Sequence, residues 1–194
     1  MINSMFKEYI FSLLNSSGNK TLQGLGKDFY YNTDYLNRVF KRFSHKSAQN
    51  YMNFCRVIYV LYDFCNGESI SVARRRQNYT ENAFNRALHS YKFPPISVIK
   101  GELEMQETIK KEYEKIQLIM ILSKAEKPIK ASELGDLAEY IKDFRESKEF
   151  CICSKPGPSG GYFISNYTKD ILLCETWINN WRNSMGIEEK YSIA

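Results

Sequence analysis

The stretch that decides the predicted fold lies at residues 32–66 and reads NTDYLNRVFKRFSHKSAQNYMNFCRVIYVLYDFCN. Asn32 is suited to be the N-cap of a helix that runs to about Phe43, because its side chain can accept a hydrogen bond from the first turn. From Ser47 to Cys65 the sequence is apolar nearly all round, as in a helix buried between two parts of a structure. The stretch therefore predicts a short helix followed by a long buried helix, which an Asn-Gly pair ends.

Short helices are expected on both sides of this buried helix. Residues 2–14 have apolar side chains at helical spacing and predict an amphipathic first helix, and a short segment at 21–29 precedes the Asn32 turn. Residues 69–77 and 80–91 then repeat the plan of short helix, turn and short helix before Pro94-Pro95 stops it. The first hundred residues thus contain one motif twice.

A second unit is expected after a boundary near residue 103, which divides the chain into domains 1–103 and 104–194. A long helix at 102–124 connects them, and short helices follow at 131–137 and 138–145. Two alternating strands around a Pro/Gly tip predict a β-hairpin, and residues 169–184 predict a closing amphipathic helix. The predicted fold is mainly α: two helix-turn-helix units joined by a linker helix, then a C-terminal α+β domain with a β-hairpin.

The charge is unevenly distributed along the 194 residues, whose net charge is +5. Residues 1–100 carry 14 Lys and Arg against 6 Asp and Glu, a net of +8, whereas the other 94 residues carry 13 against 16, a net of −3. A basic half beside an acidic half indicates that any polyanion is bound mainly by the first half.

Several classes of protein are not expected. No run of eighteen apolar residues occurs, and the opening segment contains Glu8 among alternating polar positions, so we expect a soluble cytoplasmic protein without membrane contact. Five cysteines are an odd set, and Cys151 and Cys153, both expected on one face of a strand, have no second pair nearby, so neither a disulfide framework nor a metal site is expected. With two histidines and no Gly-rich phosphate loop, neither an enzyme nor a cofactor is expected.

Residues 35–43 (YLNRVFKRF) resemble the first recognition helix of AraC/XylS transcription regulators, where a capping residue, here Asn32, precedes a Tyr-Leu-x-Arg-x-Phe-Lys core. Residues 47–56 resemble that family's Ser-x-x-x-Tyr-x-x-x-x-Arg entry into the linker helix, and residues 67–70, 83–88 and Pro94-Pro95 resemble its second unit. The resemblance covers residues 20–100 and implies a sequence-specific, double-stranded DNA-binding regulator of bacteria or phage. It departs from the family at Gly26, where an Ala is usual, and at Gln77-Asn78, where Gly plus an aromatic is usual.

The distal half resembles a winged helix. Residues 129–134 resemble the opening of that motif, and residues 160–163 resemble the return from its wing. Such a domain can make an auxiliary DNA contact or contact a protein such as RNA polymerase, and both readings stay open. The candidate DNA contacts in this half are Lys142, Arg145 and Lys155.

Candidate base contacts in the first unit are the positions that point outward from the recognition helix. Arg38 can donate two hydrogen bonds to guanine and Asn37 can pair with adenine. The remaining basic side chains are expected at phosphates. The expected core of the helix is Tyr35, Leu36, Val39 and Phe40, and the candidate contacts are Asp34, Asn37, Arg38, Lys41, Arg42 and Lys46.

The equivalent positions of the second unit supply further candidates, with a run of three arginines on the preceding helix available for the DNA backbone. A linker helix of about 18 residues, roughly 27 Å long, could hold both units against successive major grooves about 34 Å apart. The candidate contacts are Arg74, Arg75, Arg76, Glu81, Asn82, Asn85 and Arg86.

Two other functions fit the same residues. The chain could be a DNA-binding accessory protein for replication or recombination of a phage or plasmid, or a protein-interaction module that contacts RNA polymerase or another regulator. The target sequence, the direction of regulation and the oligomeric state are left open by the sequence.

Overall fold

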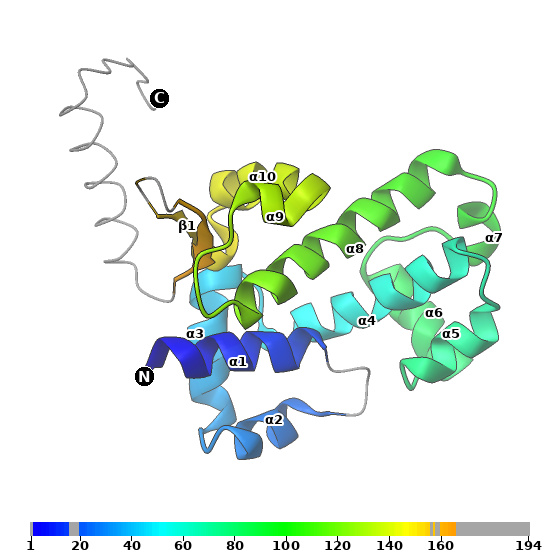
Figure 1. The fold of residues 1–194 in the computed structure, drawn as a ribbon. Coiled ribbons are helices and arrows are strands. Elements are labelled where there is room, and N and C mark those ends of the chain that lie inside the picture. The colour runs from blue at the N-terminus through cyan, green and yellow to red at the C-terminus, as the bar shows by residue number, and fades with distance from the viewer. Residues whose placement is uncertain (1, 16–19, 156, 158–159, 166–194) are drawn as a thin grey trace.

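The computed structural model describes residues 2–15, 20–155, 157 and 160–165, and it is mainly helical, as predicted (Figure 1). The first hundred residues form α1 (Ile2–Leu14), α2 (Leu22–Asp28), α3 (Thr33–Ser44), α4 (Ala48–Cys65), α5 (Ile70–Arg76), α6 (Glu81–Ser90) and α7 (Ile96–Ile99). After them come α8 (Leu103–Lys124), α9 (Ala131–Leu134), η1 (Gly135–Glu139), α10 (Tyr140–Ser147), η2 (Glu149–Cys151), β1 (Ile152–Ser154) and β2 (Tyr162–Ile164). The helix expected at 169–184 and Cys174 lie outside the described residues.

Five of the first six helices begin at a side chain that accepts a hydrogen bond from the first turn, which satisfies a backbone N–H that would otherwise have no partner in the helix. The expected cap at Asn32 is present: its side chain accepts from the N–H of Asp34 at 2.7 Å. The caps of the five helices are Thr21, Asn32, Ser47, Ser69 and Thr80.

The helix pairs α2–α3 and α5–α6 are joined by the same turn. Tyr30 and Asn78 follow the two first helices at φ 56° and 53°, and the N–H of the next residue donates to a carbonyl five residues back, from Tyr31 to Gly26 and from Tyr79 to Arg74, both at 3.0 Å. This is the Schellman arrangement, which requires a left-handed residue. Asparagine adopts that conformation readily, which suits Asn78 to this turn.

Gly26 is required by the close approach of α2 to the start of α3. A Cβ atom at this position would lie 2.8 Å from Oγ1 of Thr33, nearer than real Cβ contacts, and 3.0 Å from the backbone oxygen of Tyr31, which is a tight contact. Glycine at this position therefore has a steric cause.

The long helix α4 carries the two helix pairs near its opposite ends. In Figure 1, α3 lies beside the start of α4 and α5 and α6 lie beside its end. Eighteen residues correspond to about 27 Å at 1.5 Å per residue. Val57, Val60 and Leu61 of α4 are fully buried with α5 and α6, whereas Tyr51 and Cys55 are buried on the side of α1 and α3.

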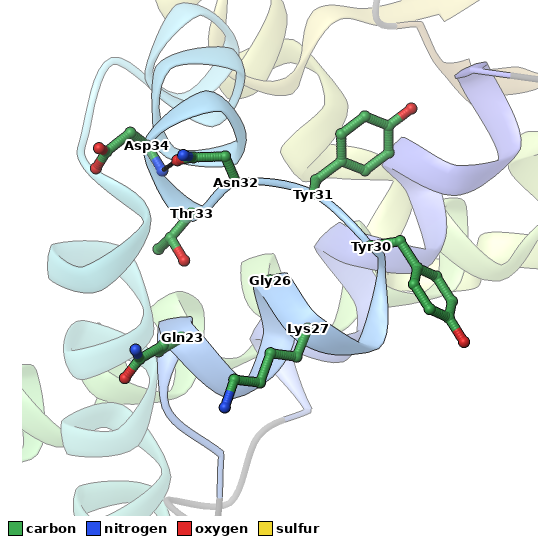
Figure 2. A pocket seen from close by; sticks show the side chains of 8 residues that line it. All are labelled: Gln23, Gly26, Lys27, Tyr30, Tyr31, Asn32, Thr33 and Asp34. Carbon is green, nitrogen blue, oxygen red and sulfur yellow. Dashed lines mark hydrogen bonds between the residues drawn. The ribbon is translucent and has the colours of Figure 1, made fainter.

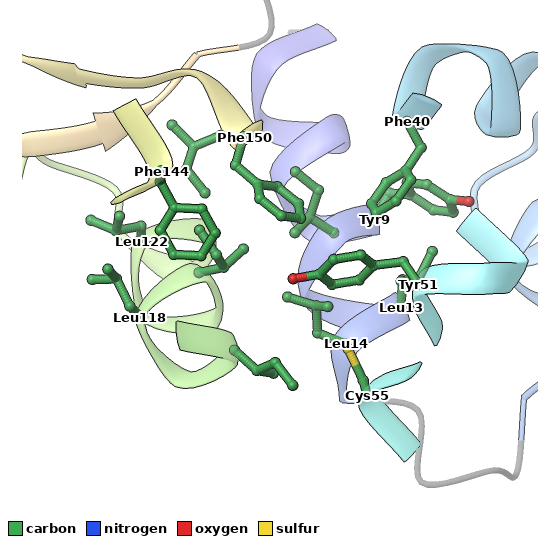
Figure 3. Packing of buried hydrophobic residues seen from close by; sticks show 14 of the residues in the cluster. Tyr9, Leu13, Leu14, Phe40, Tyr51, Cys55, Leu118, Leu122, Phe144 and Phe150 are labelled. Carbon is green, nitrogen blue, oxygen red and sulfur yellow. The ribbon is translucent and has the colours of Figure 1, made fainter. Parts of the chain in front are cut away.

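One hydrophobic cluster crosses the boundary that the sequence predicts near residue 103. Figure 3 shows Phe150 between side chains of the first and second halves. Its ring centroid lies 5.9 Å from Phe40 of α3, 5.2 Å from Tyr51 of α4 and 5.9 Å from Phe144 of α10. The helix α8 also packs along both α1 and α4. The described part of the second half is therefore built onto the first half through a shared core.

The predicted hairpin is present as two short antiparallel strands, which pair Ile152 with Ile164 and Ser154 with Tyr162. Ile129 adds an isolated bridge to Tyr162. The expectation that Cys151 stands on a strand is wrong, because it lies in the short 3-10 turn η2 with φ 45°. The local turn that brings the ring of Phe150 into the core displaces Cys151 from the strand.

Candidate nucleic-acid interface

The outer face of α3 has the side chains that the sequence predicts as DNA contacts. Asp34, Arg38, Lys41 and Arg42 are all exposed, because the opposite face of the helix is buried through Leu36 and Phe40. None of these four side chains has a hydrogen bond or ion pair to any described residue. Three cationic side chains and one carboxylate are thus available to a ligand on a single helix face.

Asn37 does not point outward as expected. Its Oδ1 accepts a hydrogen bond from the backbone N–H of Ala48 at 2.8 Å, and the residue is half-buried. Because Ala48 is the first residue of α4, this bond satisfies one of the N–H groups at the start of that helix and ties α3 to it. The expected adenine contact of Asn37 is therefore corrected to a structural role.

Tyr35 was expected in the core but is 42% exposed. Its ring stacks on that of Tyr31, with centroids 5.3 Å apart and planes 23° apart. Tyr30 is 96% exposed. Helical spacing predicts that Tyr35 is buried. Spacing alone, however, does not say which rings of a helix a neighbouring helix covers.

A shallow hollow lies at the turn between α2 and α3, beside these tyrosines. Figure 2 shows Tyr30 and Tyr31 pointing away from each other on either side of the turn, with Lys27 on α2 below them. The residues that line the hollow are Gln23, Gly26, Lys27, Tyr30, Tyr31, Asn32, Thr33 and Asp34.

Lys46 is bound to its own chain. Its Nζ lies 3.4 Å from Oε1 of Glu149 and 5.6 Å and 5.9 Å from the ring centroids of Tyr51 and Phe54. An ammonium group over an aromatic face is held by the ring quadrupole. The expected phosphate contact of Lys46 is thus in competition with an ion pair to the second half of the chain.

The outer face of α6 is exposed at Glu81, Asn82, Asn85 and Arg86, as predicted. Glu81 forms an ion pair with Arg74 at 3.3 Å, and the Arg74 side chain is only 15% exposed. The carboxylate on the outer face of α6 is therefore largely neutralised by Arg74 of α5.

The three arginines of α5 differ in their contacts. Arg76 forms ion pairs with Asp63 at 3.3 Å and with Glu68 at 2.8 Å. Arg75 is exposed and donates from Nε to the backbone oxygen of Ser71 at 3.2 Å. Of the three arginines, Arg75 has the side chain that is most available to an outside partner.

A groove between α4 and α6 contains a cation that the sequence did not single out as a contact. Arg56 stacks on the ring of Tyr79, with its guanidinium carbon 4.3 Å from the ring centroid, and it donates two hydrogen bonds to the backbone oxygen of Gln77. Arg86 and Tyr91 line the same groove. Burial raises the pKa of Tyr91 to about 12, and its hydroxyl donates to the carbonyl of Asn50 at 2.8 Å.

The candidates of the second half are exposed on α10 and after β1. Lys142 pairs with Glu146 of its own helix at 3.7 Å. Arg145 is exposed on α10, and Lys155 is exposed after β1, where its backbone N–H donates to Gly161 at 2.8 Å. Phe144 on α10 packs on Phe150, whose ring also contacts Phe40 of α3.

No helix in the described part of the chain combines the length and the apolar character that are needed to cross a bilayer. Within the same residues, no group of three or more His, Cys, Asp and Glu side chains could hold a metal ion. Burial raises the pKa of the Cys55 thiol well above its usual range, which keeps that thiol protonated. Comparison with known proteins finds no matching family model, no matching curated protein and no matching solved structure.

Proposed function

We propose that this chain is a sequence-specific, double-stranded DNA-binding transcription regulator that reads the major groove with α3 and α6. The observation that carries the proposal is the repetition of one capped turn, after α2 and after α5, at opposite ends of α4. Each turn leads into a helix whose buried face anchors it and whose outer face is polar. Such a helix pair is the geometry in which a recognition helix enters the major groove.

The α3 helix supports base contacts through Arg38, which is exposed and has no partner among the described residues. A guanidinium can donate two parallel hydrogen bonds to guanine. Such a contact favours guanine over a wrong base by about 1–3 kcal/mol. Lys41 and Arg42 follow on the same face, at the end where the helix would leave the groove, and suit phosphate contacts.

The α6 helix supports a second, weaker contact. Asn82, Asn85 and Arg86 are exposed, but the pair between Glu81 and Arg74 reduces the attraction of this face for phosphates. The length of α4, about 27 Å, is close to the 34 Å repeat of successive major grooves. One copy of the chain is therefore suited to an asymmetric site.

Selection of bound sites from a random pool of duplexes, with the full chain at physiological salt, tests the proposal. Enrichment of one asymmetric motif is expected. Arg38→Ala should relax one base position, whereas Lys41→Ala should weaken all sequences alike and reduce the dependence of affinity on salt. Lys111→Ala is the matched control, because Lys111 is exposed on α8 and also has no partner among the described residues.

The outcomes separate the proposed function from its alternatives. An enriched site near promoters with altered transcription would support a regulator, and enrichment at an origin or attachment site would support an accessory protein. No enrichment, or equal small effects of Arg38→Ala and Lys111→Ala, would refute base reading by α3 and favour a protein-interaction module.

A further inference from the structure

Three tyrosines are exposed at the turn before α3 and at the start of that helix, and no packing need accounts for their exposure. Tyr30 is 96%, Tyr31 38% and Tyr35 42% exposed. Tyr31 and Tyr35 are already stacked on each other at 5.3 Å. Exposed rings of this size are costly to leave in water and are enriched where proteins bind partners.

Tyr30 also occupies a backbone position that disfavours it. Its φ of 56° is the left-handed conformation that ends α2, where glycine or asparagine is usual. The matching residue after α5 is Asn78, with φ 53°. Phe150 also has a positive φ of 57°, but its ring is fully buried and packing accounts for it. Tyr30 gains no such burial, but exposed His45, Lys92 and Lys148 have the same conformation after α3, α6 and α10, so this φ is common to the helix ends of this chain.

Two cationic side chains lie near this turn. Lys27 lines the same hollow as Tyr30, with its side chain extending away from the Tyr30 ring (Figure 2), and Arg38 lies on α3 one turn beyond Tyr35. The carboxylate of Asp34 also lines the hollow. The carboxylate of Asp28 is paired with Lys20 at 2.7 Å. Exposed rings with cations nearby are a combination that binds single strands, because bases stack on the rings while the cations attract the phosphates.

We infer that Tyr30, Tyr31 and Tyr35 form a stacking surface for the unpaired bases of a DNA strand. This surface goes beyond the proposed reading of duplex DNA, because it contacts base faces rather than base edges. It lies at the start of α3, so a strand that is unpaired next to a duplex site can reach it while α3 holds the duplex. The hydroxyl groups are not required for this contact, and the rings are.

The experiment measures the binding of the full chain to a fluorescein-labelled oligothymidylate of about 12 nucleotides by anisotropy, with a blunt duplex of equal length in parallel. Tyr30→Gly and Tyr35→Ser are each expected to weaken single-strand binding about 5- to 150-fold, the range for the loss of one stacking ring. Tyr30→Phe should bind like the wild type. Asn78→Gly is the matched control, since it changes the same turn position after α5 and removes no ring.

Thermal unfolding of each variant separates binding from folding. Tyr30→Gly is expected to keep or raise the midpoint, because glycine suits a positive φ. Wild-type affinity in both ring-loss variants, loss in Tyr30→Phe equal to that in Tyr30→Gly, or no binding of the oligothymidylate at all would each overturn the inference. So would a change of oligomeric state on ring loss, since the rings would then bind a second copy. Duplex binding that fails while single-strand binding holds would refute only the proposed function.

Discussion

Phe150→Ala is expected to destabilise the first and second halves of the chain together. The ring is fully buried and lies 5.2–5.9 Å from the rings of Tyr51, Phe40 and Phe144, so its removal empties a space that three elements line. Phe-to-Ala changes in cores cost about 3–5 kcal/mol, from lost burial and from the cavity that remains. For a chain of this size, the midpoint of thermal unfolding should fall by about 6–20 °C.

Urea unfolding, followed both by circular dichroism and by tyrosine fluorescence, measures this loss. A single transition that moves as a whole is expected for the described fold, since the cluster includes α1, α3, α4, α8 and α10. Phe163→Ala is the matched control, because Phe163 is only partly buried on β2 and lies outside that cluster. A loss below about 1 kcal/mol, or a second transition that is insensitive to Phe150→Ala, would refute a core shared across residue 103.

Four further expectations follow from particular contacts. A fragment of residues 1–103 should lose helical content by circular dichroism, since it lacks α8 and Phe150; a fragment with the stability of the full chain would contradict this. Asn37→Ala should lower the free energy of unfolding in urea by about 1 kcal/mol, because the N–H of Ala48 loses its acceptor. Asn37→Asp keeps an acceptor oxygen and should retain most of this stability. Gly26→Ala should lower the midpoint of thermal unfolding despite the better helix propensity of alanine, because its Cβ would meet a backbone oxygen at 3.0 Å. The pKa of Tyr91, raised to about 12 by burial, lies above the value of about 10 in an unfolded chain, so its contribution to stability is present below pH 10 and is lost as the pH rises to 12; Tyr91→Phe should flatten that part of the pH profile.

The sequence predicted the helices of the first hundred residues well, because their ends are set by local chemistry. The caps at Asn32 and Ser47 bond to N–H groups two or three residues away, and helical periodicity is visible within one segment. The same reasoning placed Arg38 and Lys41 on an exposed face, where they are found. The short α7 after Pro95 was not predicted, since four residues carry too little periodic signal.

The errors in the candidate site concern side chains whose partners come from another element. Asn37 was assigned to DNA because its spacing places it near the outer face, but its acceptor oxygen meets Ala48, eleven residues further on. Lys46 stays a predicted phosphate contact, but its ion pair with Glu149 competes with that contact. Tyr35 was assigned to the core, but no helix among the described residues covers it. Periodicity states which residues share a face and does not state what that face meets.

By itself, the sequence determined the order of the helices, the cap at Asn32, the repeated helix pair and the basic character of the first half, since each depends on residues a few positions apart or on composition. Only the tertiary structure decided that Phe150 joins the two halves and that Tyr30, Tyr31 and Tyr35 remain in solvent. Burial and exposure depend on contacts between residues as far apart as 40 and 150, and the geometry of such contacts is set by how the whole chain packs.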